Sequence, residues 1–304
     1  MTSSEIKALA YAAGAVAAGI AKADRVPPAE MSRYDRWIAA GEHGEMTYME
    51  KYADVRSDPR LLLDGAQSVI ATAFNYYTPS PRGRDGLVWA RYSLGRDYHE
   101  ELRERLDEVA RAITDATGAR CRVCVDTAPL RERYWAVTSG IGFTGRNGML
   151  IIPGTGSWCL LGFIITTLPL PPDTPSADSC LGCGLCVDAC PGHALDGNGN
   201  VDARRCRSYL TIEKRCDTLD TPLGTRIYGC DICQEVCPHN RRAPLSTIPA
   251  FIPRQSILDL GRDDILHMEQ SSFSAIFTHS AIKRAKLAGL LRNARACDPD
   301  KENK

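Results

Sequence analysis

The sequence carries no excess of charge of either sign and no apolar run long enough to cross a membrane. Lysine and arginine together number 37, aspartate and glutamate also number 37, and the formal net charge is +0. This balance excludes a polyelectrolyte tail. No stretch reaches the roughly 18 uninterrupted apolar residues of a membrane-spanning helix. With 304 residues, 44% of them hydrophobic, the sequence predicts a globular protein of about two domains without a membrane segment.

The N-terminus lacks the features of an export signal, although residues 8–21 are apolar. Neither a strongly basic stretch nor a twin arginine precedes them, and residues 6–23 favour a helix that runs into a strand. The chain has 13 cysteines, and in the cytoplasm clustered cysteines stay reduced and usually bind metal. We therefore expect a cytoplasmic protein with a metal centre.

The first part of the chain has few cysteines and alternates helical with strand-like segments. Residues 97–118 predict an amphipathic helix with apolar side chains at helical spacing, ended by Gly118. Apolar strands are predicted at 68–77, 120–126 and 157–170, and the last is apolar enough to be buried on both faces. Cys121 and Cys124 fall on opposite sides of the second strand, which favours packing over metal binding. This alternation predicts an α/β domain.

A linker with four prolines follows at 169–179, and nine of the 13 cysteines lie between residues 180 and 240. The last sixty residues have helical character and end in a basic segment. The predicted organisation has three parts: an α/β domain that binds cofactor and substrate at 1–170, a ferredoxin-like two-cluster domain at 171–245 and a helical C-terminal segment at 246–304.

The cysteine-rich part begins with four cysteines and a proline within twelve residues. Cys180, Cys183, Cys186 and Cys190-Pro191 follow the pattern C-x2-C-x2-C-x3-C-P, which binds [4Fe–4S] clusters in bacterial ferredoxins. A structural zinc site is the alternative, but zinc uses two separate C-x2-C pairs instead of three ligands in one tight loop. The pattern therefore favours an iron–sulfur centre.

A second motif, C-x2-C-x3-C-P at 230–238, has Ile227 where a fourth cysteine would fall. Two four-iron clusters need eight thiolates, and the two motifs supply seven. The eighth ligand must come from elsewhere, and the near candidates are Cys206 and Cys216.

In two-cluster ferredoxins the last cysteine of each motif binds the other cluster. The same exchange predicts two ligand sets here. One set is Cys180, Cys183, Cys186 and Cys237. The other is Cys190, Cys230, Cys233 and the cysteine from outside the motifs.

Motifs along nearly the whole chain resemble those of the epoxyqueuosine reductases. They are, in order, MTYMEKYADVRSDPRLLLDGAQSVIATAFNYY, ARYSLGRDYHEELRERL, VDTAPLRERYWAVTSGIGFTGRNGMLI, GSWCLLG, RCRSYLTIEK and YGCDICQEVCPHN. The resemblance implies reduction of the epoxide of epoxyqueuosine to queuosine, at the wobble position of tRNA with a GUN anticodon. It also implies two [4Fe–4S] clusters and a base-off cobalamin held between the α/β and ferredoxin-like domains. In the family pattern the eighth thiolate is Cys206, which leaves Cys216 free.

The resemblance also places five residues near the corrin ring of the cobalamin: Arg56, Leu150, Ile152, Leu161 and Ser208. The alternative for the three apolar residues is core packing, and for Arg56 a solvated loop charge. The sequence has no D-x-H-x-x-G loop to supply a lower histidine ligand, which is consistent with a base-off cofactor.

The resemblance makes Asp126, at the end of a predicted strand, the expected proton donor to the oxygen that leaves the epoxide, and also places it in the cobalamin site. To protonate an alkoxide near neutral pH, its pKa would have to be raised by burial against the corrin. The alternative is that Asp126 caps a helix beginning near residue 128. Tyr98 and His99 fit the family pattern and are expected to line the substrate pocket.

Two departures from the family pattern concern Ala90 and the C-terminus. Some members have a cysteine near the cobalt at the position of Ala90, so a thiol there cannot be essential to this chain. The chain stops soon after residue 296, without the C-terminal helical repeats of some relatives, which leaves the extent of tRNA contact open.

A chain of zero net charge can bind tRNA only if its charges are unevenly distributed. Residues 274–296 contain five basic residues, among them Arg292, and no acid. More arginines surround Cys206 and follow Asn240. The alternative is that these basic residues are scattered, solvated charges that form no tRNA-binding face. The expected tRNA contacts are Lys214, Lys283, Arg284 and Lys286.

Two rival functions remain open at this point. A reductive dehalogenase-like corrinoid enzyme would share the clusters and cofactor but act on a small molecule. A two-cluster electron carrier would leave the α/β domain without a purpose. We expect a monomer that takes electrons from an unidentified low-potential donor.

Overall fold

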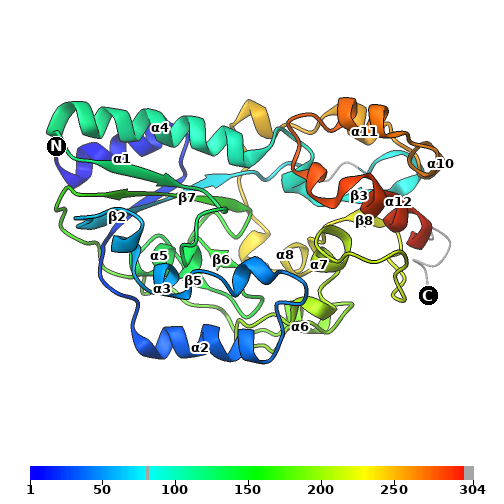
Figure 1. The fold of residues 1–304 in the computed structure, drawn as a ribbon, viewed down its shortest axis with the longest axis horizontal. Helices are drawn as coiled ribbons and strands as arrows, with labels where there is room; N and C mark the ends of the chain where they lie inside the picture. The colour runs from blue at the N-terminus through cyan, green and yellow to red at the C-terminus, as the bar shows by residue number, and fades with distance from the viewer. Residues whose placement is uncertain (80–81, 298–304) are drawn as a thin grey trace.

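The computed structural model describes residues 1–79 and 82–297. Two parts lie side by side in Figure 1: a sheet flanked by helices near the N-terminus, and a mostly helical part that carries the C-terminus. The last residues of the predicted helical segment, 298–304, lie outside the described residues. Within the described chain, no helix is both long enough and apolar enough to span a bilayer.

Four strands form the main sheet in the order β1-β2-β7-β4. They are β1 (Ala17–Lys22), β2 (Ser68–Asn75), β4 (Cys121–Cys124) and β7 (Cys159–Thr166). They confirm the strands predicted in the first part and the strand that follows the N-terminal helix. Helices and strands alternate as predicted, but all pairings in this sheet are antiparallel instead of the parallel ones typical of such alternation.

Helices cover both faces of this sheet (Figure 1). One face packs against α1 (Ser3–Ala12) and α4 (Tyr98–Thr117), and the other against α5 (Glu132–Thr138). The shorter elements of this part are α2 (Pro28–Ala39), η1 (Thr47–Met49), α3 (Ala53–Ser57), η2 (Pro59–Leu61), β5 (Phe143–Thr144) and β6 (Leu150–Ile151).

Helix α4 confirms the helix predicted at 97–118. Asp97 caps its start by accepting the backbone N–H of His99 at 3.0 Å. Gly118 ends it with φ 71°, a left-handed conformation that glycine adopts without strain. The apolar stripe of the helix packs on the sheet through Leu102, Leu106, Val109 and Ile113.

Strand β7 is a central strand, and it is buried unevenly along its length. Its last five residues are buried, as predicted for a strand covered on both faces, whereas 159–161 are partly exposed. On the neighbouring strand β4, Cys121 packs against the cluster under α1 and α4, and Cys124 is buried in the cluster under α5. The prediction that these two cysteines pack on opposite faces is confirmed.

The proline-rich linker runs beside the edge strand β1. The Asp173 carboxylate accepts the Ile20 N–H at 2.8 Å, and the Asp173 N–H donates to the Ile20 carbonyl at 2.8 Å. Lys7 of α1 forms an ion pair with the same carboxylate at 2.6 Å. These contacts fix the linker to the first part before the chain enters the cysteine-rich part.

The second part has its own core, which combines residues 87–94 with residues of the C-terminal part of the chain. Strand β3 (Val88–Trp89) pairs in parallel with β8 (Arg226–Tyr228). Apolar side chains from 87–94 share one buried cluster with side chains from 212–228 and 257–297. Residues 87–94, which fall in the predicted domain 1–170, therefore pack with the C-terminal helices.

The remaining elements are short helices. Those among the cysteines are α6 (Leu185–Asp188), η5 (Ala203–Arg205), α7 (Arg207–Ile212), α8 (Ile232–Glu235) and η6 (Pro238–Asn240). Those of the C-terminal segment are η7 (Pro249–Phe251), α9 (Gln255–Leu258), α10 (Arg262–Leu266), α11 (Gln270–Ile276), η8 (Ala281–Ala285) and α12 (Lys286–Ala296). Two further turns, η3 (Arg84–Gly86) and η4 (Arg91–Ser93), flank β3.

Candidate functional site

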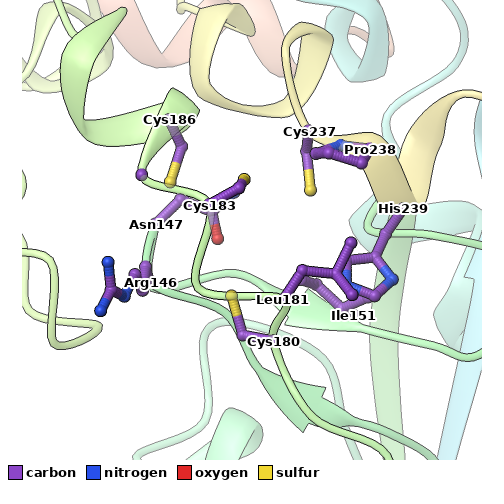
Figure 2. Close-up of a pocket in the computed structure, with 11 residues that line it drawn as sticks. Arg146, Asn147, Ile151, Cys180, Leu181, Cys183, Cys186, Cys237, Pro238 and His239 are labelled. Atoms are coloured by element: carbon purple, nitrogen blue, oxygen red, sulfur yellow. The ribbon is translucent and has the colours of Figure 1, made fainter.

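Four of the predicted ligand thiols line one pocket, drawn in Figure 2. They come from the loop before α6, from α6 itself and from the residue that precedes η6. Gly182 and Gly184 have φ 68° and 79°, which lets this loop turn tightly between the cysteines. The four are Cys180, Cys183, Cys186 and Cys237.

The second predicted set of thiols comes from other elements. Cys206 precedes α7, Cys233 lies in α8, and Cys230 lies just before α8. Burial and then the neighbouring Cys230 and Cys206 raise the pKa of the Cys233 thiol, and Cys190 contributes to the same shift. Burial raises the pKa of Cys230 to about 11, and Cys206 adds to it. The pKa values of these four thiols therefore depend on one another, and their assignment to one cluster with Cys206 stays a prediction.

Cys216, the other candidate for the eighth ligand, makes different contacts. Its thiol donates to the Thr218 carbonyl at 3.0 Å and lies 3.7 Å from a guanidinium nitrogen of Arg292. In the described part of the chain, no three His, Cys, Asp or Glu side chains are close enough together to bind a single metal ion.

Asp126 lies two residues beyond the end of β4, with its side chain 56% exposed. Its carboxylate accepts a hydrogen bond from His99 Nε2 at 2.9 Å. The other ring nitrogen, Nδ1, lies 2.7 Å from the carboxylate of Asp97, which caps α4. The imidazole is therefore held between two carboxylates, one fixed by the helix and one facing outward.

This geometry decides where the proton resides. Desolvation disfavours the charged imidazole, but the hydrogen bonds to Asp126 and Asp97 raise the pKa of His99 to about 9. Desolvation would also raise the pKa of Asp126, but the hydrogen bonds from His99 and Tyr98 bring it below its usual value. His99 and Tyr98 therefore hold the pKa of Asp126 low in this structure, and a rise through burial against the corrin stays a prediction.

The alternative role predicted for Asp126, a helix cap, is wrong. Helix α5 begins only at Glu132, and the residue before it, Arg131, makes no side-chain cap. Asp126 instead has φ 50°, unusual for a residue other than glycine. Its N–H donates to the Glu132 carboxylate at 2.7 Å. Glu132 is a contact that the sequence did not reveal, since a glutamate in the first turn of a helix is common.

Arg284, from the C-terminal segment, acts on Asp126 through its charge. Its charge contributes to the low pKa of Asp126. Its guanidinium lies 5.4 Å from the centre of the Tyr48 ring and pairs with Glu213 at 2.7 Å. Tyr48, which is 44% exposed, lies in the first motif shared with the family, but nothing in that motif singled it out as a site residue.

The residues expected near the corrin have different surroundings. Leu150 and Ile152 are buried in the cluster under α5, and the partly exposed Leu161 packs against the same cluster. Arg56 is only 9% exposed and donates to the carbonyls of Lys51 and Tyr48 at 3.3 and 3.4 Å. The prediction of a solvated loop charge is therefore wrong for Arg56, because its guanidinium binds backbone carbonyls of the Tyr48 turn. Ser208 lies in the first turn of α7 beside Cys206.

Ala90 lies beside the loop that carries the second group of thiols. It is 3% exposed, and its N–H donates to the Tyr228 carbonyl at 2.8 Å. A Cβ added to Gly229 would lie 2.4 Å from the Cβ of Ala90. The position that holds cysteine in some family members is thus filled here by a small, buried side chain.

The four expected tRNA contacts are exposed or partly exposed, but one arginine of the predicted basic segment is buried. Arg292, in the predicted basic segment, is 3% exposed, so it cannot belong to a phosphate-binding face. Its guanidinium donates to the carbonyls of Leu210 and Lys214 at the end of α7, a favourable place for a cation. The exposed or partly exposed contacts are Lys214, Lys283, Arg284 and Lys286.

Comparison with known proteins gives consistent results for both parts of the chain. A family model described as epoxyqueuosine reductase QueG, DUF1730, matches residues 56–127, and a 4Fe-4S double cluster binding domain matches 179–240. The second match spans both cysteine motifs and confirms the prediction of two [4Fe–4S] clusters.

Curated relatives match over nearly the whole chain. An epoxyqueuosine reductase of Synechococcus sp. is 39% identical over 271 residues, covering 87% of this chain and 84% of the relative. That of Gloeobacter violaceus is 39% identical over 306 residues, covering 97% and 95%. A crystal structure of epoxyqueuosine reductase with an epoxyqueuosine-modified stem loop of tyrosine tRNA matches with TM-score 0.86 and 32% identity, over 96% of this chain and 80% of that one. The Bacillus subtilis enzyme, in a structure with its catalytic aspartate loop swung out of the active site, matches with TM-score 0.85 and 31% identity.

Proposed function

Since the chain belongs to the epoxyqueuosine reductase family, we propose that it reduces the epoxide of epoxyqueuosine in tRNA to the alkene of queuosine. Both carbon–oxygen bonds of the ring break and the oxygen leaves as water, so each turnover consumes two electrons and two protons. The observation that carries the proposal is the His99–Asp126 pair, a proton store with an exposed carboxylate, on a chain that also gathers two groups of cluster thiols.

The clusters would transfer the electrons one at a time. We assign one to Cys180, Cys183, Cys186 and Cys237, and the other to Cys190, Cys206, Cys230 and Cys233. The shared pocket of the first set and the mutual influence of the second support this assignment. Because the thiols of Cys230 and Cys233 have raised pKa values, cluster assembly must displace their protons.

We assign the cobalamin to the partly exposed start of β7. Leu161 leaves apolar surface there that a flat macrocycle could cover, next to the cluster that contains Leu150 and Ile152. When bound, the cofactor would supply the strongly reducing metal chemistry that side chains lack. The residues that would hold it are those expected from the family: Arg56, Asp126, Leu150, Ile152, Leu161 and Ser208.

The hydrogen bonds of His99 and Asp126 support a route for the proton. The imidazolium of His99 is anchored to Asp97 and donates to Asp126, whose carboxylate is more than half exposed. Asp126 would receive this proton and pass it to the departing oxygen. A raised resting pKa on Asp126 is then unnecessary, because His99 supplies the proton during the reaction.

The decisive experiment is turnover of an RNA stem loop that contains epoxyqueuosine, with a low-potential chemical reductant and detection of queuosine by mass spectrometry. The visible spectrum of the same sample tests for bound corrinoid, which would exclude an electron carrier. A protein that contains corrinoid and binds no tRNA would instead point to a reductase of small molecules.

The pH dependence of kcat/KM should report His99. A pKa of about 9 predicts a level rate between roughly pH 7 and 8 and a fall above roughly pH 9, as the imidazolium loses its proton. His99→Gln cannot carry that proton, so its rate should be lower and should lack the alkaline fall. An unchanged profile in this variant would remove His99 from proton delivery.

Replacing Lys283, Arg284 and Lys286 together by alanine should weaken tRNA binding. Each lost phosphate contact should reduce the slope of log K against log salt by about 0.7 to 0.9, because fewer counterions are released. The matched control is the triple replacement of Lys22, Arg103 and Arg111, equally exposed basic residues elsewhere on the chain. Equal losses in both variants would mean that net charge, not this surface, determines binding.

A further inference from the structure

Asp126 has a backbone conformation that must be maintained by its surroundings. Its φ is 50°, and the Thr127 N–H donates to the Val125 carbonyl at 2.5 Å, which places Asp126 at the centre of a three-residue turn. Turns of this kind with positive φ are rare and strained for residues other than glycine. The turn decides where the exposed carboxylate points, so whatever fixes it also positions the proton donor.

The contact that fixes this turn comes from Glu132, six residues along the chain. Its carboxyl oxygen accepts the Asp126 N–H at 2.7 Å, and within the described residues this N–H has one hydrogen-bond partner. Glu132 is the first residue of α5, where a helix N-terminus favours an acidic side chain. The helix itself is anchored, because Trp135 and Ala136 are buried in the cluster below the sheet. A rigid helix therefore presents the acceptor.

The charge of Glu132 is not what the contact requires. Desolvation, and then the negative charge of Asp126, raises the pKa of Glu132 to about 8. At neutral pH most molecules therefore carry a neutral carboxyl group here, which can still accept a hydrogen bond through its carbonyl oxygen. An amide oxygen at the same place should accept it equally well.

We propose that Glu132 is a positioning residue for the proton donor: it holds the Asp126 N–H and so keeps the Asp126 carboxylate beside His99 and facing the substrate. The inference rests on the proposed function, in which Asp126 delivers a proton. It identifies no new catalytic group, since Glu132 acts through the backbone of Asp126.

Two replacements of similar size separate positioning from proton transfer. Glu132→Met removes the acceptor, and Glu132→Gln keeps it but cannot transfer a proton. With the epoxyqueuosine stem loop as substrate, Glu132→Met should lower kcat roughly 10- to 100-fold with KM little changed, since small misplacements of catalytic groups have effects of this size. Glu132→Gln should remain within about threefold of the unmodified chain.

The chain offers a matched control in α1. Glu5 is also a first-turn glutamate whose carboxylate accepts a backbone N–H, that of Thr2, at 2.7 Å. Glu5→Met removes the same kind of bond far from Asp126 and should leave kcat unchanged. Iron content and the thermal midpoint of each variant report whether the fold is intact.

Each remaining outcome would overturn the inference. Equal losses in the Met and Gln variants would mean that the Glu132 proton is used in the reaction. Unchanged kcat in both would mean that the bond has no role in catalysis, and loss of iron or a large fall in the thermal midpoint of Glu132→Met would make the residue structural. Failure of the proposed function itself would be separate, because the unmodified chain would then show no turnover.

Discussion

Asp126→Asn is expected to reduce turnover of epoxyqueuosine at least about 100-fold, the lower end of what a general acid contributes. Asparagine has nearly the shape of aspartate and can still accept a hydrogen bond from His99, so the turn and the fold should persist. The amide cannot take a proton from His99 and pass it on, and the loss should therefore appear in kcat. The measurement is steady-state turnover of the stem loop with a chemical reductant.

Bound cobalamin, iron and tRNA affinity must be measured on the same preparation. Asp126 is also an expected cobalamin contact, and loss of the cofactor could abolish activity without any involvement of a proton. Near-full activity with normal cofactor content would remove Asp126 from the mechanism. A helix-cap role could not then explain the residue, because α5 begins six residues further on.

Cys206→Ser should lower iron from about eight to about four atoms per chain, since one of two four-iron clusters would lose a ligand. The thiols of Cys190, Cys230 and Cys233 need a fourth ligand, and the pKa values show that Cys206 interacts with them. Iron analysis and the visible spectrum of the anaerobically purified variant provide the measurement. The remaining iron should belong to the pocket of Figure 2.

Cys216→Ser is the matched control, because it removes a thiol from the same segment. Its thiol contacts Thr218 and Arg292, so about eight irons should remain. If Cys216→Ser lost the cluster and Cys206→Ser did not, the eighth ligand would be Cys216 and the family pattern would not apply to this chain.

The sequence predicted elements whose causes are local. Helix α4 could be located because its apolar stripe repeats at helical spacing and Gly118 ends it. The cysteine motifs could be identified because their spacing over a few residues already determines which metals fit. Both features depend on neighbours within one or two turns of chain.

Features that depend on distant partners could not be predicted. The proton held by His99 requires Asp126, 27 residues away, and the same contact lowers the pKa of Asp126 where burial alone would have raised it. Arg292 has the composition of a surface residue, but carbonyls of α7 bind it in the interior. Charge and burial at such positions are properties of the folded chain and not of a segment.

The parallel pair of β3 and β8 limits how this protein can be divided. The core that supports the cluster loops includes Leu87, Trp89 and Leu94, which precede the first cysteine motif by more than eighty residues. A fragment that begins at the linker would lack these side chains and expose the apolar surface they cover. The cysteine-rich segment is therefore unsuited to transfer into another protein as an independent electron-transfer module. A usable graft would have to include the residues around β3, either as a separate peptide or as a permuted insert.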